Sequence, residues 1–112
     1  MNNCIFCSSE VRAAKIMEND LAFVIYDKFP KTRGHLLIIP KRCSENFFDT
    51  TPPERAAMCE LVDLAREYLD REYNPTGYNI ILNTGKDAGQ VVFHTHMHLI
   101  PRYTGEELGL IG

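Results

Sequence analysis

The chain has 112 residues, of which 45% are hydrophobic and 24% charged. This balance is typical of one globular domain spanning residues 1–112 and argues against disorder. A formal net charge of −3 provides no basic surface for a nucleic-acid backbone. No apolar run approaches the roughly 20 residues of a membrane span, and the N-terminus lacks the pattern of a secretory signal. We therefore expect a soluble, cytoplasmic protein that binds neither nucleic acid nor a membrane.

Five strands are predicted from the alternation of apolar and polar residues and from β-branched content. They cover residues 14–18, 21–26, 35–39, 78–83 and 91–101. Loops are predicted over 27–34 and 84–89, where proline or glycine interrupts the pattern. The tail over 103–112 carries three glycines and is expected to be loosely held.

A single long helix is predicted between the third and fourth strands. It begins at Thr51-Pro52-Pro53-Glu54, which supplies a capping residue, a proline at the first helical position and a glutamate three residues after the cap. It ends at Asn74-Pro75-Thr76-Gly77. Cys59 lies within this helix and is expected to pack at or near the core. Helical spacing predicts a buried stripe of Met58, Leu61, Val62, Ala65 and Leu69. Strands, one main helix and further strands in this order predict an α+β fold with an antiparallel sheet.

Two of the four cysteines, Cys4 and Cys7, form a Cys-x-x-Cys pair. In a chain without a secretory signal, such a pair indicates metal or redox chemistry more often than a disulfide. A redox pair would stand at the start of a helix that follows a strand. Cys4 and Cys7 precede every predicted strand, so the sequence favours a metal site.

Three of the four histidines, His94, His96 and His98, stand at alternate positions. In a β-strand alternate side chains share one face, so these imidazoles are predicted to form a row about 6–7 Å apart. A row of imidazoles is costly in a core because each ring nitrogen needs a partner. An exposed strand without function is disfavoured because Val92 and Ile100 share the same face. The residue types leave two kinds of site open, a catalytic three-histidine metal centre and an imidazole nucleophile that attacks phosphorus.

The loop before the histidines favours phosphorus chemistry. Gly85 and Gly89 allow a close approach of the backbone, and a turn there can present N–H groups to phosphate oxygens. Gln90 adds a neutral donor. A glycine-containing loop directly before a histidine row therefore indicates a site for a phosphorylated substrate.

The segment Gly89–Ile100, with Gln90 and the histidine run, resembles the signature of the histidine-triad (HIT) family of nucleotide hydrolases and transferases. Gly34–Lys41 resembles the second marked segment of that family, and Asp27 stands where the family places a ribose-binding acid. The likeness extends from Cys4 to Arg102 in the family's order. It implies a HIT-like α+β fold, with about five antiparallel strands and one main helix, and a homodimer that pairs across the main helix and the following strand.

The same resemblance implies a role for each site residue. His96 is implied as the nucleophile, which forms a nucleotidyl-histidine with the α-phosphate of a nucleotide conjugate before water releases the nucleoside monophosphate. His98 is implied as a donor to a phosphate oxygen, and His35 as a fourth histidine that supports the triad. The implied substrate-binding residues are Asp27 at the ribose, Asn83, Gly89 and Gln90 around the phosphate and leaving group, and Phe6 and Ile25 as walls for the base. An aromatic or aliphatic residue at either of these last two positions equally suits a core.

Some bacterial members that the chain resembles hold a structural zinc ion. Their ligands are an N-terminal Cys-x-x-Cys pair, a histidine after the Ile-Pro-Lys segment and the first histidine of the triad. Cys43 stands in place of that second-segment histidine, and both residue types bind zinc. The resemblance therefore implies a closed site formed by Cys4, Cys7, Cys43 and His94. Such an ion would be structural, because four protein ligands leave no open position for water, and it would make residues 1–10 a zinc-binding segment.

The implied substrates are purine nucleoside phosphoramidates or adenylylated small molecules. Two alternatives remain: cleavage or phosphorolysis of dinucleoside polyphosphates, and a nucleotide- or zinc-binding partner protein with little turnover. His98 argues against the uridylyltransferase branch of the family, which has glutamine at that position. Val91 is a departure from the family pattern, since many of its hydrolases carry serine or threonine there to assist the leaving group. We therefore expect amine or alkoxide leaving groups to be protonated less efficiently.

Overall fold

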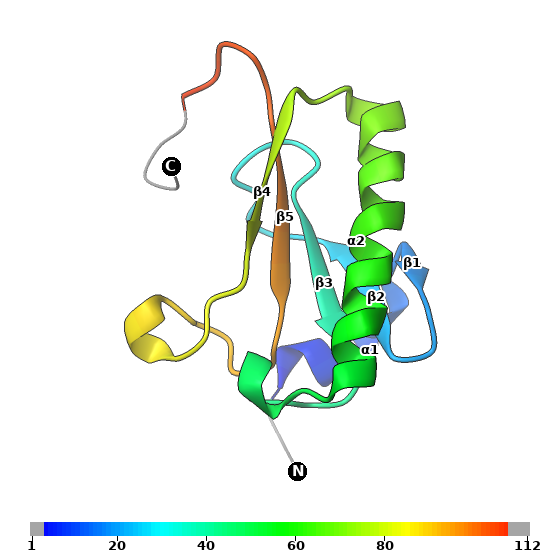
Figure 1. The fold of residues 1–112 in the computed structure, drawn as a ribbon, viewed down its shortest axis with the longest axis vertical. Helices are drawn as coiled ribbons and strands as arrows, with labels where there is room; N and C mark the ends of the chain where they lie inside the picture. Colours follow the sequence, from blue (N-terminus) through cyan, green and yellow to red (C-terminus); the bar gives the residue numbers. More distant parts are fainter. Residues whose placement is uncertain (1–3, 108–112) are drawn as a thin grey trace.

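The computed structural model of the protein describes residues 4–107, which form a five-stranded antiparallel sheet in the order β1-β2-β3-β5-β4 (Figure 1). The strands are β1 (Met17–Glu18), β2 (Ala22–Tyr26), β3 (Leu36–Pro40), β4 (Gly77–Ile81) and β5 (Met97–Arg102). The helices are α1 (Ser9–Ala13) and α2 (Pro52–Tyr73), with single 3-10 turns η1 (Ile5–Cys7), η2 (Phe47–Asp49) and η3 (Lys86–Ala88). This arrangement confirms the predicted α+β fold with one main helix.

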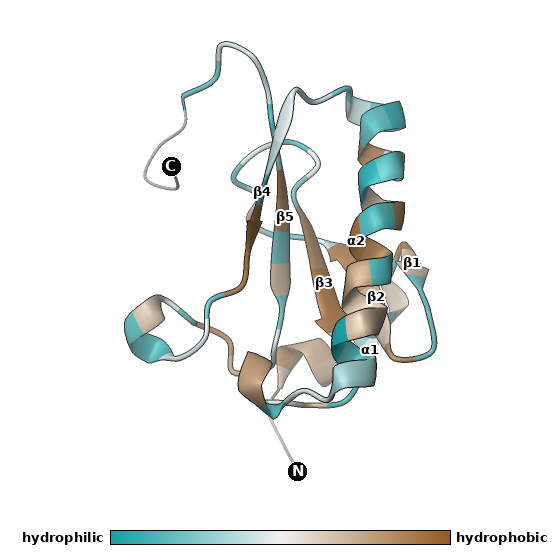
Figure 2. Cartoon of the chain, in the orientation of Figure 1, coloured by the Kyte–Doolittle hydropathy of each residue, from teal (hydrophilic) through white to brown (hydrophobic). Residues whose placement is uncertain are grey.

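The two faces of the sheet carry separate cores. On one face, alternate residues of β2 and β3 pack against α2 through the buried residues Ala22, Val24, Leu36, Ile38, Met58, Leu61, Ala65 and Leu69. The intervening residues of the same strands face the N-terminal segment, in a second cluster made of Phe6, Phe23, Ile25, Leu37 and Ile39. Because both faces are covered, β2 and β3 are apolar almost throughout, as Figure 2 shows.

The α2 helix begins and ends where the sequence predicts. The Thr51 hydroxyl accepts a hydrogen bond from the Glu54 backbone, and the Glu54 carboxylate accepts one from the Thr51 backbone at 2.8 Å. Asn74 ends the helix in the left-handed conformation at φ 52°. The predicted stripe is buried, except that Val62 is partly buried. The prediction for Cys59 is wrong: it is exposed, because one residue after the buried Met58 the helix has turned by about 100°.

The predicted strand over 91–101 is wrong at its beginning, because β5 starts only at Met97. Upstream of it the chain bonds to the segment that follows β3 instead of joining the sheet. The Thr95 N–H donates to the Ser44 carbonyl at 2.8 Å, and the Thr95 and Ser44 hydroxyls lie 2.8 Å apart. Both residues are buried. The imidazoles of His94 and His96 are therefore set by this local pairing and not by the pleat of a strand.

The N-terminal prediction also needs correction. The predicted strand over 14–18 is reduced to β1, and the residues before it form the unpredicted helix α1. The Ser8 hydroxyl caps this helix by accepting from the Val11 N–H at 3.2 Å. Since Val11 packs against the second core cluster, α1 covers the sheet face opposite α2.

The tail predicted over 103–112 is held at its start. Tyr103 is buried, its hydroxyl donates to the Arg33 carbonyl at 2.7 Å, and the Arg33 guanidinium lies 3.8 Å from its ring centre. The rest of that prediction, over 108–112, lies outside the described residues, as do residues 1–3 of the predicted zinc-binding segment. None of the described helices is long and apolar enough to cross a membrane.

Candidate active site

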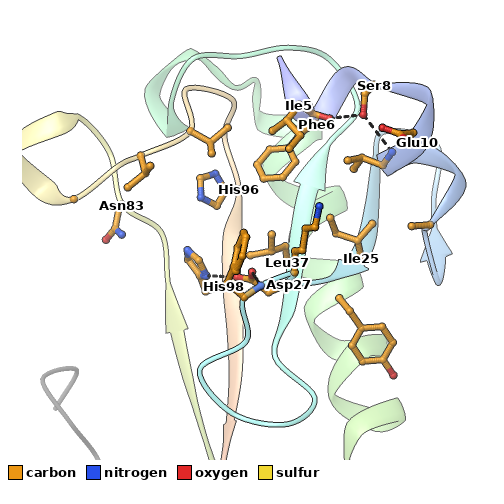
Figure 3. Close-up of a pocket in the computed structure, with 18 residues that line it drawn as sticks. Ile5, Phe6, Ser8, Glu10, Ile25, Asp27, Leu37, Asn83, His96 and His98 are labelled. Atoms are coloured by element: carbon orange, nitrogen blue, oxygen red, sulfur yellow. Dashed lines mark hydrogen bonds and ion pairs between the residues drawn. The ribbon is translucent and has the colours of Figure 1, made fainter. Parts of the chain in front are cut away.

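A cavity of about 630 Å³ opens on the sheet face that carries the N-terminal segment (Figure 3). Its volume is in the range of small-molecule binding sites. The η1–α1 segment, β2, the loop after β2, β3 and the segment before β5 all contribute to its wall. Seven of the predicted site residues line it: Phe6, Ile25, Asp27, Asn83, Gly89, His96 and His98.

His96 is the most buried ionisable group of the cavity, with 9% of its surface exposed. Its Nδ1 lies 2.9 Å from the His94 carbonyl oxygen. A carbonyl can only accept, so Nδ1 carries the proton and Nε2 carries the free lone pair. Burial lowers the pKa of His96 below its ordinary value, against an opposing effect of the hydrogen bond to His94. The ring is therefore neutral at pH 7 and has one nucleophilic nitrogen.

His98 and His35 form a chain of hydrogen bonds whose direction is set by the backbone. The Lys31 N–H donates to His35 Nδ1 at 3.0 Å, so the proton of the neutral His35 ring is on Nε2. His35 Nε2 lies 3.0 Å from His98 Nδ1 and donates to it, which leaves His98 with its own proton on Nε2. Burial lowers the pKa of both rings, that of His98 to about 4 with help from His96 and His35. At neutral pH His98 is thus a neutral hydrogen-bond donor.

Asp27 stands beside these two histidines at the end of β2. Its Oδ2 lies 3.3 Å from His35 Nε2 and 3.8 Å from His98 Nδ1, while Oδ1 accepts from the Phe29 N–H at 2.8 Å. Each carboxylate oxygen accepts more than one hydrogen bond. Asp27 therefore retains acceptor capacity toward the cavity that it lines.

Gln90 has a different position from the one expected, because it is buried and does not line the cavity. Its amide nitrogen donates to the carbonyls of Glu45 and Val92 at 2.7 and 3.0 Å, and its oxygen accepts from the Gly85 N–H at 2.8 Å. The side chain thus closes the loop over 85–90 on itself and ties it to the segment after β3. Both of its amide hydrogens are used in these bonds.

The glycine loop presents Asn83 and Gly89 to the cavity. Gly85 and Gly89 have φ of 94° and 99°, which residues with a Cβ rarely adopt. A Cβ on Gly89 would also lie 3.6 Å from the Asn83 amide nitrogen. The bare backbone therefore keeps the space next to the Asn83 amide open.

Phe6 and Ile25 both line the cavity and belong to the second core cluster. The Phe6 ring contacts the imidazoles of His94 and His96 edge-on, with ring centres 5.8 and 5.2 Å apart. It therefore shields from water the ring that carries the free nitrogen.

A second cluster lies next to this site and contains Cys4, Cys7, Cys43 and His94. Their four potential ligand atoms all lie within 4.8 Å of one another. His94 Nε2 lies 2.8 Å from the Pro40 carbonyl and so carries the proton, which directs the lone pair of Nδ1 at the sulfur atoms of Cys4 and Cys7, at 3.0 and 3.6 Å. A backbone carbonyl behind a ligating histidine is the usual arrangement in metal sites.

Two thiols of this cluster, those of Cys7 and Cys43, are costly to ionise without a cation. Burial, together with Cys4 and Cys43, raises the pKa of Cys7 to about 11, and burial also raises the pKa of Cys43. Three sulfurs and one imidazole nitrogen are a typical tetrahedral zinc set. The residues present therefore fit a metal ion with four protein ligands, and the predicted ligands are brought together.

The η1–α1 segment forms a wall of the cavity that was not predicted from the sequence. Its lining residues are Ile5, Ser8, Glu10, Val11 and Ala14, in addition to Phe6. The cap at Ser8 was the available signal, since a serine followed by an acidic first turn is typical of a helix start. The hydrogen bond from the Lys31 N–H to His35 could not be predicted from the residue types, because any residue other than proline supplies that N–H.

A profile of the HIT domain matches residues 8–105, a range that includes all the histidines described above. The chain belongs to the HIT family. Among its relatives are an uncharacterized HIT-like protein of Mycoplasma pneumoniae, 40% identical over 91% of this chain and 73% of the relative, and the protein Hit of Bacillus subtilis, 36% identical over 97% and 78%. A third, the adenylylsulfatase HINT3 of Arabidopsis thaliana, is 39% identical over 90% of this chain, which spans only 53% of that relative's length.

Solved structures of HIT family members have the same fold. A zinc-bound histidine triad family protein of Mycobacterium smegmatis superimposes with a TM-score of 0.86 at 34% identity, over 97% of this chain and 81% of that one. A HIT family member of Bacillus subtilis superimposes with a TM-score of 0.84 at 36% identity, over 93% and 76%. The predicted HIT-like fold is thereby confirmed, and a zinc ion occurs in at least one neighbour of this fold.

Proposed function

We propose that this HIT protein hydrolyses or transfers nucleoside 5′-phosphate conjugates through a covalent intermediate on His96. The observation that carries the proposal is the bond from His96 Nδ1–H to the His94 carbonyl, which leaves Nε2 unprotonated on a ring that lines the cavity. Nε2 attacks the α-phosphorus and the bond to the leaving group breaks. Water then cleaves the P–N bond and releases the nucleoside monophosphate.

Neutral donors support this chemistry. His98 has its proton on Nε2, and in our proposal it donates to a non-bridging phosphate oxygen as charge develops there. His35 positions His98 and is itself positioned by the Lys31 N–H. The amide of Asn83 and the backbone at Gly89 complete the surroundings of the phosphate in this proposal.

The proposed substrates are phosphoramidates or adenylylated small molecules. Asp27 would accept from the ribose hydroxyls, and Phe6 and Ile25 would enclose the base between apolar walls. The name of the HINT3 relative, adenylylsulfatase, agrees with attack at an adenylyl group. Gln90 holds the loop and is not assigned a contact with the substrate.

We further propose that the cysteine cluster holds a structural zinc ion, with Cys4, Cys7, Cys43 and His94 as ligands. Their grouping within 4.8 Å and the zinc-bound neighbour support this assignment. A closed four-ligand ion supplies rigidity and no reactive water. Cys4 and Cys7 flank Phe6 in the chain, so the ion would fix the wall that covers His96.

We also propose that the protein is a homodimer that pairs along β4 and α2. In the described sheet β4 is an edge strand, and Ile80 on β4 and Leu64 on α2 are 58% and 45% exposed. An edge strand with exposed apolar side chains is a surface that proteins commonly cover.

Mass spectrometry tests these assignments together. The protein is mixed briefly with adenosine 5′-phosphoramidate, adenylyl sulfate or diadenosine triphosphate, and denatured and native spectra are recorded. We expect a denatured mass increased by one adenylyl group in the wild type and no increase in His96→Ala, which should still bind AMP. The native spectrum reports zinc and the dimer.

The outcomes separate the alternatives. An adduct with diadenosine triphosphate alone would assign the protein to dinucleoside polyphosphates. If the protein binds AMP but forms no adduct with any conjugate and releases no AMP from any of them, it is a nucleotide-binding protein and not an enzyme. An adduct that persists in His96→Ala would place the nucleophile on another residue.

A further inference from the structure

Val91 faces the solvent at the cavity, with 84% of its surface exposed. Ile5 and Phe29 line the same cavity and are 50% and 81% exposed. Exposed apolar side chains gathered around one cavity indicate a binding surface. The rim of this cavity thus offers apolar contact, and at position 91 it offers no hydroxyl.

The hydroxyl groups of the described lining residues are occupied by other partners. The Ser8 hydroxyl donates to the Ile5 carbonyl at 2.7 Å. The Tyr26 hydroxyl is bonded to those of Tyr68 and Tyr73, and burial raises its pKa. Neither is placed to give a proton to a departing group.

An N–H group near the phosphate can act as a general acid only if the proton that it gives to the leaving group is replaced, and the described N–H groups have no such source. Gln90 does not line the cavity, and both of its amide hydrogens are bonded to backbone carbonyls. His98 could pass on a proton from Nε2 only by taking one at Nδ1, where its neighbours are His35 and the Asp27 carboxylate. An ionised carboxylate has no proton to give, and His35 in turn meets the Lys31 amide, which does not give up its hydrogen. This chain polarises an oxygen but cannot deliver a proton. A solvent-exposed hydroxyl differs, because it both donates and accepts and water can restore its proton.

Two lining carboxylates and one ammonium group complete the described ionisable groups of the wall. Glu10 and Asp27, when ionised, can only accept. Lys28 is exposed and adjoins Asp27, at the ribose end of the proposed substrate. Among the described lining residues Lys28 is the remaining candidate for a proton donor to the leaving group, and the experiment below therefore includes a Lys28 variant.

From these observations we propose that the site selects conjugates whose leaving group departs as an anion without a proton, namely mixed anhydrides of a nucleoside monophosphate with an apolar carboxylic acid, and that Val91 sets this selection. The inference rests on the proposed function. A carboxylate fits it because the anion is stable on its own in water, whereas an amine leaving group needs a proton. The apolar rim favours an acid with an apolar chain over sulfate.

The reaction balances without a general acid. Nε2 of the neutral His96 forms a bond to phosphorus, and the P–O bond to the acyl group breaks with both electrons on the carboxylate oxygen. The imidazole becomes cationic, and its Nδ1–H remains bonded to the His94 carbonyl. Water then attacks phosphorus, the P–N electrons return to Nε2, and the proton of the water passes to solvent.

The test compares Val91→Thr with Val91→Ala. Threonine adds a hydroxyl at nearly the volume of valine, whereas alanine removes methyl groups without adding one. Rates of adenylyl-His96 formation are measured with phenylacetyl adenylate, acetyl adenylate, adenylyl sulfate and the tryptamine phosphoramidate of AMP. The intrinsic reactivity of each substrate is the same whichever variant is used. A change between variants in the ratio of the phosphoramidate rate to the phenylacetyl adenylate rate therefore isolates the contribution of residue 91.

We expect Val91→Thr to raise that ratio about 10²-fold, the low end of general acid catalysis, and Val91→Ala to leave it within about threefold of the wild type. The wild type should prefer phenylacetyl over acetyl adenylate and over sulfate by about tenfold in kcat/KM. An unchanged ratio in Val91→Thr overturns the proposal. A phosphoramidate rate that falls about 10²-fold in Lys28→Gln also overturns the proposal, because Lys28 would then be the proton donor that the site was argued to lack. Failure to form an adduct with any conjugate would instead refute the proposed function.

Discussion

The Phe6 ring joins the cysteine cluster to the candidate nucleophile, and its removal tests both packing and electrostatics. The ring is 7% exposed and contacts the His94 and His96 imidazoles edge-on. A buried phenylalanine removes about 150–250 Å² from water, which at about 25 cal/mol per Å² amounts to roughly 4–6 kcal/mol. Alanine retains part of that burial, so we predict that Phe6→Ala lowers the free energy of unfolding by about 3–5 kcal/mol.

The same substitution should change the titration of His96. Burial is the main cause of its lowered pKa, and the Phe6 ring is part of what buries it. Water admitted in Phe6→Ala stabilises the imidazolium, so the pKa of His96 rises back toward the ordinary value of 6.5. Since only the neutral ring attacks phosphorus, the acidic limb of the pH–rate profile should move to higher pH.

Urea unfolding at pH 7 measures the first effect, and the pH dependence of adenylyl-His96 formation measures the second. Phe6→Leu is the control, because it keeps most of the apolar volume and should therefore change both quantities less. A Phe6→Ala variant within about 1 kcal/mol of the wild type, with its acidic limb unmoved, would refute the reasoning that the ring packs on His96 and excludes water from it.

Two further predictions concern the zinc cluster and the start of α2. Cys43→Ser should lose one equivalent of zinc and the sensitivity of its melting temperature to chelators, whereas Cys43→His, which keeps a ligand type, should retain both; equal zinc content in the two variants would contradict the assignment. Glu54→Gln should lower the free energy of unfolding at pH 7 by about 2 kcal/mol, because Arg42, half-exposed and bidentate, holds the pKa of Glu54 down to about 2. A folded-state pKa below the ordinary 4.5 stabilises the protein above that value, so the difference between wild type and variant should vanish as the pH falls from 4.5 toward 2; a difference that persists at pH 2 would refute this origin.

The parts of the fold that the sequence predicts well are those decided by neighbouring residues. The start of α2 follows from Thr51 and Glu54, which bond to each other across three positions. The end at Asn74 follows from a residue that tolerates the left-handed conformation. The candidate site residues were grouped through their resemblance to a family, and the structure brings seven of them around one cavity.

The parts that were missed depend on partners distant in the chain. Alternation predicted that His94, His96 and His98 share one strand, but Thr95 bonds instead to Ser44, 51 positions away. Gln90 has the chemistry of a substrate donor, yet Glu45 takes one of its amide hydrogens. Residue types alone do not reveal such competition, because each group is equally able to bond to substrate, solvent or backbone.

The bond from the Lys31 N–H to His35 has a consequence for how this protein tolerates change. The tautomers of His35 and His98 depend on a main-chain atom, so nearly any side chain at position 31 preserves them. Proline at that position removes the hydrogen, and an insertion or deletion over 28–34 moves it. The proton arrangement of the site therefore depends on the length of this surface loop and on a residue other than proline at position 31, and not on which side chain that residue carries.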